Sequence, residues 1–421
     1  MTSKIEALFL GGPIRKDAFQ IYVIQGMSLG LALVGSIIVA RTLGPAQKGI
    51  FDLFNLLSSF ILDFGLLGFG SGLLYYLANR GRSLSLIHGT ALVFAILLGV
   101  LTALIGWLGL PFWMAIFPGL DVWVILLPFL LAALTYYRLI WTNIMTGINR
   151  AVATYRIGLY FTICNVVAIF ALWKLDCLDV ERIVALTGLL TVLNGIVAFF
   201  VLFRQEPRLR PSIPLARESL RYGLVIYIGF LANVLHFKID QVMINYWLGT
   251  DAVGIYVVSV RWAEMLFILD NAIISASLSK ISSLPPHESY DLTNRLFKIQ
   301  LLISGSAGIL LVMAAYPLVM GLYGEAYRGA VWPLILLVPG MVAWSVSKIV
   351  SGALTYKSNR ASYVTKVAIS GFFVNLFLNY ILIKALRMGI SGASLASSFT
   401  YLFVALCIQL KARNILKRIN I

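Results

Sequence analysis

Long apolar runs, separated by short polar or glycine-containing segments, make up most of the chain. A helix needs about 20 mostly apolar residues to cross a bilayer, and about twelve runs of this length fit the sequence. The runs are continuous and do not alternate, which favours helices over the strands of a membrane barrel. We therefore predict an all-α integral membrane protein with about twelve transmembrane helices. Their approximate positions are 18–40, 51–78, 84–110, 122–146, 152–173, 183–203, 220–247, 253–278, 296–320, 331–354, 362–384 and 391–411.

The two halves of the chain share a degenerate repeat. The pattern leucine-glycine, four residues, then glycine-isoleucine-aromatic occurs at 43–51 and again 205 residues later, at 248–256. Further matches follow in the same order, with an offset that grows to 210. They pair 60–63 with 267–270 and 149–151 with 359–361. We infer two six-helix lobes, and because six is even, both lobes share one orientation and are related by an axis along the membrane normal.

A polar segment separates the predicted lobes. It runs from 204 to 221 and holds three prolines and five arginines. Because the prolines disfavour one continuous helix across it, we predict a cytoplasmic basic linker at 205–221. The N-terminal six-helix lobe then covers 1–204 and the C-terminal lobe 222–421.

Composition excludes an ordinary soluble domain. The 421 residues are 60% hydrophobic and 12% charged, with a mean hydropathy of +0.92. The net charge of +16 could indicate nucleic-acid binding, but its distribution argues otherwise. Segments predicted to be cytoplasmic hold 22 Lys and Arg, against 7 in the outer loops and 4 within spans. This excess predicts a multi-pass protein of the cell (inner) membrane with both termini in the cytoplasm, and no nucleic-acid partner.

Motifs of the common enzyme and nucleotide sites are absent from the sequence. It contains no phosphate-binding P-loop, no metalloprotease helix and no nucleophile elbow. Three cysteines and three histidines are scattered, without a zinc spacing. The loops are too short for a catalytic domain of about 50 residues. We therefore expect no enzyme activity, cofactor or metal, and transport driven by a gradient or the membrane potential.

Charged residues inside the predicted spans are the main chemical signal, because a charge at the bilayer centre costs about 2.5–3.5 kcal/mol even on lenient scales. Arg138 and Lys348 occupy matched positions in the repeat, each about 16 Å from a cytoplasmic helix end. Asp63 and Asp270 are also matched. Two interpretations stay open: the bases contact a substrate, or Asp63–Arg138 and Asp270–Lys348 are structural ion pairs.

The stretch 236–270 carries further charges that the first half does not match. Two apolar runs flank a tight turn at 248–251, which predicts an antiparallel helical hairpin. Its asymmetric charges favour a functional role, and they are Lys238, Asp240, Arg261 and Glu264. Asp240 and Arg261 lie at similar depth, so we predict a salt bridge between them. His236 is interpreted as a satisfied polar residue in preference to a proton carrier.

These motifs resemble a known family. The segments at 40–51, 240–249, 254–261 and 322–327 are similar to the polysaccharide-biosynthesis flippases of the multidrug/oligosaccharidyl-lipid/polysaccharide exporter superfamily. The resemblance implies two six-helix lobes around a cationic cavity lined by helices 1, 2, 7 and 8. Arg138, Arg261, Lys348 and Lys238 fit a site for the diphosphate or sugar, whereas Asp240 and Glu264 dilute the positive charge. Twelve helices favour the O-antigen or capsule type over the lipid II flippases, which usually carry two more.

The expected function is to move an undecaprenyl-diphosphate-linked oligosaccharide from the cytoplasmic to the outer leaflet by alternating access. Its expected partners are this polyprenyl-linked substrate, the lipid bilayer and other polysaccharide-assembly membrane proteins. Asp240, Glu264, Asp63, Asp270 and His236 are candidates for coupling or charge pairing. One alternative is a cation-coupled multidrug exporter of the same architecture, although 18–40 lacks the acid usual there. Another is a membrane glycosyltransferase or polymerase, against which the short outer loops argue.

Overall fold

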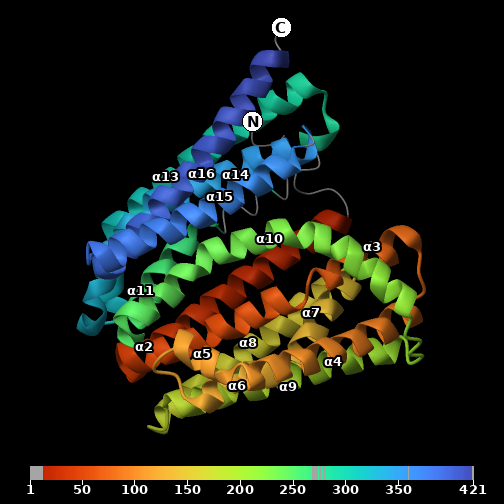
Figure 1. Cartoon of the computed structure of the whole chain (residues 1–421), viewed down its shortest axis with the longest axis horizontal. Coiled ribbons are helices and arrows are strands. Elements are labelled where there is room, and N and C mark those ends of the chain that lie inside the picture. The colour runs from red at the N-terminus through yellow and green to blue at the C-terminus, as the bar shows by residue number, and fades with distance from the viewer. Residues whose placement is uncertain (1–12, 268–273, 275–276, 278–280, 359, 420–421) are drawn as a thin grey trace. The chain divides into compact units, whose positions relative to one another are not determined.

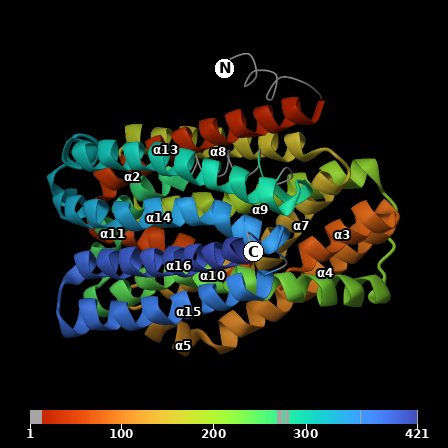
Figure 2. The same cartoon turned by 90° about the horizontal axis from the view of Figure 1, so that it is seen from above.

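The computed structural model describes residues 13–267, 274, 277, 281–358 and 360–419. This part of the chain consists of helices joined by short connections and contains no strand (Figures 1 and 2). The α-helices are α2 (Pro13–Gly65), α3 (Phe69–Arg80), α4 (Leu84–Leu108), α5 (Leu110–Ile116), α6 (Val122–Leu130), α7 (Ala132–Gly147), α8 (Ala151–Lys174), α9 (Val180–Gln205), α10 (Ile213–Leu248), α11 (Thr250–Glu264), α13 (Pro286–Leu322), α14 (Val331–Tyr356), α15 (Ala361–Asn379) and α16 (Gly389–Ile419). A 3-10 helix, η1 (Glu325–Ala330), and a π-helical turn, η2 (Tyr380–Ala385), complete the set.

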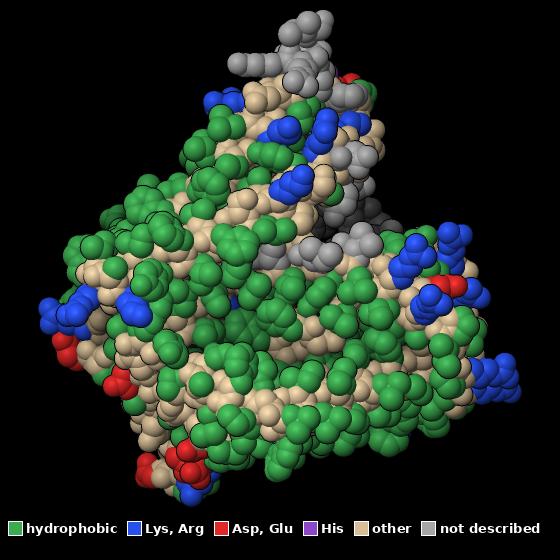
Figure 3. All heavy atoms as spheres, in the orientation of Figure 1, with side chains coloured by type: hydrophobic (Ala, Val, Ile, Leu, Met, Phe, Trp, Pro, Cys, Tyr) green, Lys and Arg blue, Asp and Glu red, His purple; other side chains and the backbone are tan. Residues whose placement is uncertain are grey.

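The helices have the length and apolarity of membrane spans. Within the described ranges, eight are long and apolar enough to cross a bilayer, or ten if each of two bent helix pairs is one span. The count is below twelve partly because α2 joins two predicted spans, and because α11 leads into residues that the structure does not describe. Hydrophobic side chains cover the helix faces seen in Figure 3, and Lys and Arg gather near helix ends. The chain is therefore an all-helical, multi-pass membrane protein.

The repeat is visible in the backbone. Gly44 has φ 71° and ψ 177°, and Gly249, its partner 205 residues later, has φ 88° and ψ 178°. Gly119 and Gly324, also 205 apart, have φ values of 88° and 90°. Side chains other than glycine's rarely tolerate this region, so both halves use glycine for the same sharp reversal. Pro45 follows directly and suits the first position of a helix, which is why the chain turns at once into the second part of α2.

Two compact units divide the described chain, and each is considered by itself. The first comprises Met1–Leu43, Phe54–Ala115 and Leu120–Tyr227, and the second Gly44–Leu53, Ile116–Gly119 and Ile228–Ile421. The predicted linker is shorter than expected, because α9 ends at Gln205 and α10 already begins at Ile213. In the second unit, α15 and α16 run side by side (Figures 1 and 2), and α16 packs along α14.

A glycine crossing explains why 44–53 belongs to the second unit. A Cβ on Gly49 would lie 1.9 Å from the carbonyl oxygen of Thr250, and one on Gly254 would lie 2.1 Å from that of Pro45. Pro45 and Thr250 are repeat partners, as are Gly49 and Gly254, so the contact is reciprocal. The second part of α2 therefore meets α11 backbone against backbone, at a distance that only glycine permits.

Candidate functional site

A buried ion cluster lies beside this glycine crossing. Lys48 and Asp52 are one turn apart on α2, form an ion pair and have side chains that are each 1% exposed. From α11, Arg261 Nη2 donates to Asp52 Oδ1 at 3.1 Å, and the Arg261 side chain is 32% exposed. One acid thus lies between two bases, which leaves the cluster with a net positive charge. The buried charges of Lys48 and Asp52 are tolerated because each has a partner.

Further charges of the second unit surround Arg261. Lys238 on α10 and Arg261 both act electrostatically on Glu264, which is exposed at the end of α11. Tyr323 and Tyr327 lie within the electrostatic reach of Asp52. Asp240 on α10 also lies within the electrostatic reach of Glu264, so the α10–α11 hairpin and the second part of α2 bring together three bases and three acids, with no excess charge.

Lys48 and Asp52 are not among the predicted site residues, because Lys48 falls between the predicted spans 18–40 and 51–78. The spacing of a base and an acid four residues apart, just after a glycine-proline turn, was the available signal. It could be recognised only by knowing that α2 continues directly from Pro45.

The predicted salt bridge between Asp240 and Arg261 is wrong. Asp240 is buried, and its carboxylate accepts hydrogen bonds from the Tyr256 hydroxyl at 2.5 Å, the Gln241 N–H at 2.8 Å and the Ser397 hydroxyl at 3.3 Å. Tyr256 and Arg261 are five residues apart on α11, which rotates them by about 140° from one another. The side of α11 that meets Asp240 is thus not the side that carries Arg261.

His236 is buried one turn before Asp240, and it is not satisfied as expected. Its ring stacks on Tyr401 at a centroid distance of 5.0 Å and on Trp344 at 5.4 Å. Neither ring nitrogen has a hydrogen-bond partner within the described structure. Each unsatisfied buried polar group costs about 1–3 kcal/mol, so the position is unfavourable unless the ring has another role.

Arg138 on α7 is half-buried in the first unit, and the predicted pair with Asp63 does not form. Among the residues that the structure describes, the Arg138 guanidinium makes no ion pair. Asp63 acts electrostatically on Tyr227, whose hydroxyl donates to the Phe64 carbonyl at 3.0 Å. The repeat thus indicates that Arg138 and Asp63 both lie within spans, but it does not indicate whether the two side chains are neighbours.

Lys348 on α14 is the counterpart of Arg138, and it lies over an aromatic ring. Its Nζ is 4.1 Å from the centroid of Phe267, a cation–π geometry. Its predicted partner Asp270 lies outside the described residues. Over the described ranges, no three His, Cys, Asp or Glu side chains come together in a way that could hold a metal ion.

Comparison with solved structures identifies the fold. An inward-facing multidrug resistance MATE family transporter of the MOP superfamily superposes with a TM-score of 0.79 at 14% identity, covering 94% of this chain and 95% of that one. The lipid II flippase MurJ, in an inward closed conformation, gives a TM-score of 0.75 at 15% identity, over 93% and 87%. At this identity the likeness concerns the fold, which exporters and flippases share.

Comparison of sequences places the chain more narrowly. A curated relative, the probable low-salt glycan biosynthesis flippase Agl15 of Haloferax volcanii, is 24% identical over 409 residues, covering 92% of this chain and 81% of the relative. The family described as polysaccharide biosynthesis protein matches residues 14–284, well over half of the chain. The resemblance carried by the sequence motifs is thereby confirmed, and the chain belongs to the polysaccharide biosynthesis protein family.

Proposed function

We propose that this protein is a flippase that moves an undecaprenyl-diphosphate-linked oligosaccharide from the cytoplasmic to the outer leaflet of the cell membrane, by alternating access. Membership of the polysaccharide biosynthesis family and a relative named as a glycan biosynthesis flippase support this proposal. Both termini are cytoplasmic in it, as the excess of Lys and Arg predicts. The substrate then passes to other membrane proteins that assemble the surface polysaccharide.

The observation that carries the proposal is Arg138. A half-buried guanidinium in a spanning helix, with no ion pair among the described side chains, is costly unless something else compensates its charge. Arginine binds phosphate through two parallel hydrogen bonds, and a lipid-linked diphosphate supplies the missing negative charge. An exported cationic drug would be repelled by the same group, which favours the flippase over the multidrug exporter.

Other charges have secondary roles in the proposal. Lys348, Arg261 and Lys238 are further contacts for the diphosphate or sugar, with Asp52 holding Arg261 at 3.1 Å as a positioning residue. Asp240 and His236, buried one turn apart on α10, are the proposed coupling pair. Glu264, Asp63 and Asp270 balance charge.

The test reconstitutes the purified chain in vesicles of neutral phospholipid. The probe is an undecaprenyl-diphosphate-linked oligosaccharide with a fluorescent sugar, and an impermeant reductant bleaches only the outer leaflet. We expect bleaching to proceed beyond the outer-leaflet fraction when the protein is present. A fluorescent lipophilic cation, assayed in parallel, should not be moved. Movement of the cation without movement of the lipid-linked sugar would establish the exporter instead.

A further inference from the structure

In the first unit, side chains with rings fill a groove between α4, α7 and α9. His88 on α4 donates from Nδ1 to the Glu206 carbonyl at 3.1 Å and accepts at Nε2 from the Tyr137 hydroxyl on α7 at 2.9 Å. The centroid of the Phe199 ring on α9 lies 6.1 Å from that of the His88 ring. The chain leaves α9 at Glu206 with extended backbone, φ −143° and ψ 90°. The linker that joins α9 to α10, residues 206–212, therefore begins against these rings.

The same linker then lies along α4 and is held there through its backbone. The Arg210 N–H donates to the Ser85 carbonyl at 3.2 Å, and the Ser212 N–H donates to the Thr90 hydroxyl at 3.0 Å. A Cβ on Gly89 would lie 2.5 Å from the Arg210 nitrogen, so the linker approaches α4 at a distance that only glycine permits. The groove of the first unit thus holds an extended peptide.

The corresponding groove of the second unit is open. In the repeat, α13, α14 and α16 correspond to α4, α7 and α9, and α13 and α16 each pack against α14 (Figure 2). A cavity of about 320 Å³ lies between the three helices. Because α16 continues as a helix to Ile419, beyond the position that corresponds to the end of α9, the chain does not turn across this groove. The cavity is lined by Tyr290, Thr293, Asn294, Phe297, Lys298, Val350, Ala353, Gln409, Ala412 and Arg413.

Smaller side chains without rings account for the open groove. They occupy the three positions that hold rings in the first unit, and two of them line the cavity. They are Thr293 in place of His88 at the offset of 205, and Ser347 and Gln409 in place of Tyr137 and Phe199 at the offset of 210.

The floor of the cavity is buried, and its rim is basic. Tyr290 and Thr293 are buried in the floor, whereas Lys298 and Arg413 are exposed at the rim. Among the described residues that line the cavity there is no Asp or Glu. The amides of Asn294 and Gln409 each offer a donor and an acceptor, as a peptide backbone requires of its partners.

We propose that this groove of the second unit binds an extended acidic peptide of a partner protein, on the side of the membrane predicted to be cytoplasmic. The amides contact the peptide backbone, the cavity accepts a side chain, and Lys298 and Arg413 form exposed ion pairs with acidic residues. The repeat favours a peptide over a lipid headgroup, because the corresponding groove holds a peptide. Binding of this kind goes beyond the proposed flipping and is measured without transport.

The test measures fluorescence anisotropy of labelled heptapeptides with the purified full chain in a neutral detergent. One probe copies residues 206–212 with Arg208→Glu and Arg210→Glu, and a second probe copies the unchanged, basic segment. We expect the acidic probe to bind saturably, about tenfold tighter than the basic one. Each exposed ion pair contributes about threefold to affinity, so Lys298→Ala with Arg413→Ala should weaken binding of the acidic probe about tenfold.

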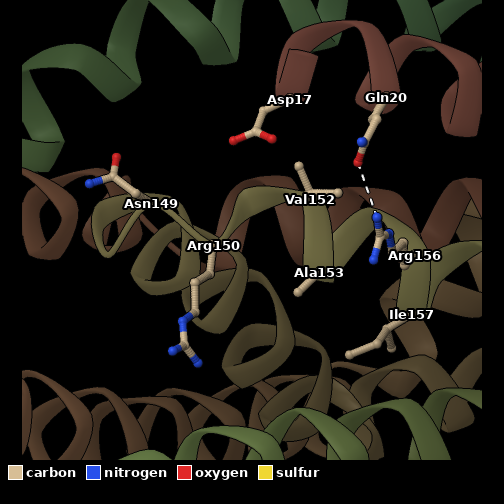
Figure 4. Close-up of a pocket in the computed structure, with 8 residues that line it drawn as sticks. All are labelled: Asp17, Gln20, Asn149, Arg150, Val152, Ala153, Arg156 and Ile157. Atoms are coloured by element: carbon tan, nitrogen blue, oxygen red, sulfur yellow. Dashed lines mark hydrogen bonds between the residues drawn. The ribbon is translucent and has the colours of Figure 1, made fainter. Parts of the chain in front are cut away.

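The matched control removes two cations from another surface. Arg150→Ala with Arg156→Ala takes two exposed arginines from the start of α8 in the first unit. Figure 4 shows Arg156 pointing toward Gln20, to which it donates at 3.1 Å, and Arg150 pointing away. This control should bind the acidic probe as wild type does. Equal losses in the two double variants would mean that net charge alone attracts the probe, and would overturn the proposal.

A variant that fills the cavity tests its place in the fold. Thr293→His with Gln409→Phe restores two of the rings of the first groove and should abolish binding of the acidic probe, while the unfolding temperature reports that the chain is folded. Unchanged affinity in this variant would overturn the proposal. Displacement of the acidic probe from wild type by an equal concentration of short-chain phosphatidylglycerol would also overturn it, since the groove would then be a lipid site.

Discussion

At the scale of single residues, the charges of this protein differ in what their removal leaves behind. Asp52 lies between Lys48 and Arg261, so Asp52→Ala would leave Lys48 buried without a partner. Such a loss costs about 3–5 kcal/mol, and we expect a marked fall in the thermal unfolding temperature of the purified protein. Arg261→Ala should cost less, because that side chain is partly exposed. An Asp52→Ala protein that unfolds at the wild-type temperature would contradict the structural role of the pair.

Arg138 predicts the opposite pattern. Its removal strands no acid among the described residues, so Arg138→Ala should keep the wild-type unfolding temperature while lowering flipping of the lipid-linked sugar at least about tenfold. Arg138→Lys should lose less, because lysine keeps the charge but not the two-pronged contact. Stability and flipping are measured on the same preparations. If Arg138→Ala were unstable and Asp63→Asn restored it, the two residues would be a structural pair and the substrate role would be lost.

His236 tests the proposed coupling. Phenylalanine fits its stack with Tyr401 and Trp344 and removes two unsatisfied nitrogens, so His236→Phe should raise the unfolding free energy by about 1–3 kcal/mol. If His236 carries a proton, the same variant should lose any stimulation of flipping by a pH gradient. The measurement compares flipping rates with and without the gradient. Full stimulation in His236→Phe would remove this residue from the coupling pair.

At the scale of elements, the sequence predicts where the helices lie along the chain, but not which side of each helix contacts which neighbour. Apolar runs define spans because hydrocarbon tolerates no unpaired backbone, and glycine at 44 and 249 marks both hairpins. Depth along a helix follows from counting residues from a turn. Rotation about the axis does not, and this is why Asp240 meets Tyr256 and Arg261 meets Asp52. The neighbours of Arg138 and His236 depend on which helices pack together, and one sequence does not specify that.

The crossing of α2 and α11 gives a prediction at the same scale. A methyl group on Gly254 would overlap the Pro45 carbonyl, so Gly254→Ala must push the helices apart. We expect a loss of about 1–3 kcal/mol in unfolding free energy, as for overpacked cores, and a weaker Asp52–Arg261 contact. Gly26→Ala is the control, because nothing lies within 4 Å of that site on α2 and alanine favours helix. Equal unfolding temperatures for the two variants would show that the crossing is not tightly packed.

At the scale of the whole molecule, the repeat builds its ion cluster from unequal halves. The first half supplies Lys48 and Asp52, where the second has Val253 and Val257 at the offset of 205. The second half supplies Arg261, where the first has Leu56. The two halves thus share a backbone conformation, but each supplies only some of the charged side chains. The cluster therefore forms only when both halves contribute. The two halves carry different side chains on the same backbone turn, which explains why the repeat is a degenerate pattern in the sequence.

This division can be tested by exchanging the charges between the halves. The contact between Gly49 and Gly254 is reciprocal. Moving every charge to its repeat partner should therefore rebuild the same cluster, with α11 supplying the Lys–Asp pair and α2 supplying the arginine. The complete exchange combines Lys48→Val, Asp52→Val, Leu56→Arg, Val253→Lys, Val257→Asp and Arg261→Leu. A half exchange, with only the three changes in the first half, removes Asp52, the one acid of the cluster, and adds a base at buried position 56 with no acid beside it, so it should lose about 3–5 kcal/mol of unfolding free energy.

Unfolding temperature decides between the outcomes of this exchange. We expect the complete exchange to recover most of the stability that the half exchange loses, because each buried charge regains its partner across the crossing. A complete exchange no more stable than the half exchange would mean that the repeat relates the backbones of the two helices but not the surroundings of their side chains. The buried positions of Leu56, Val253 and Val257 make the test demanding, since a charge placed there without its partner has no route to water.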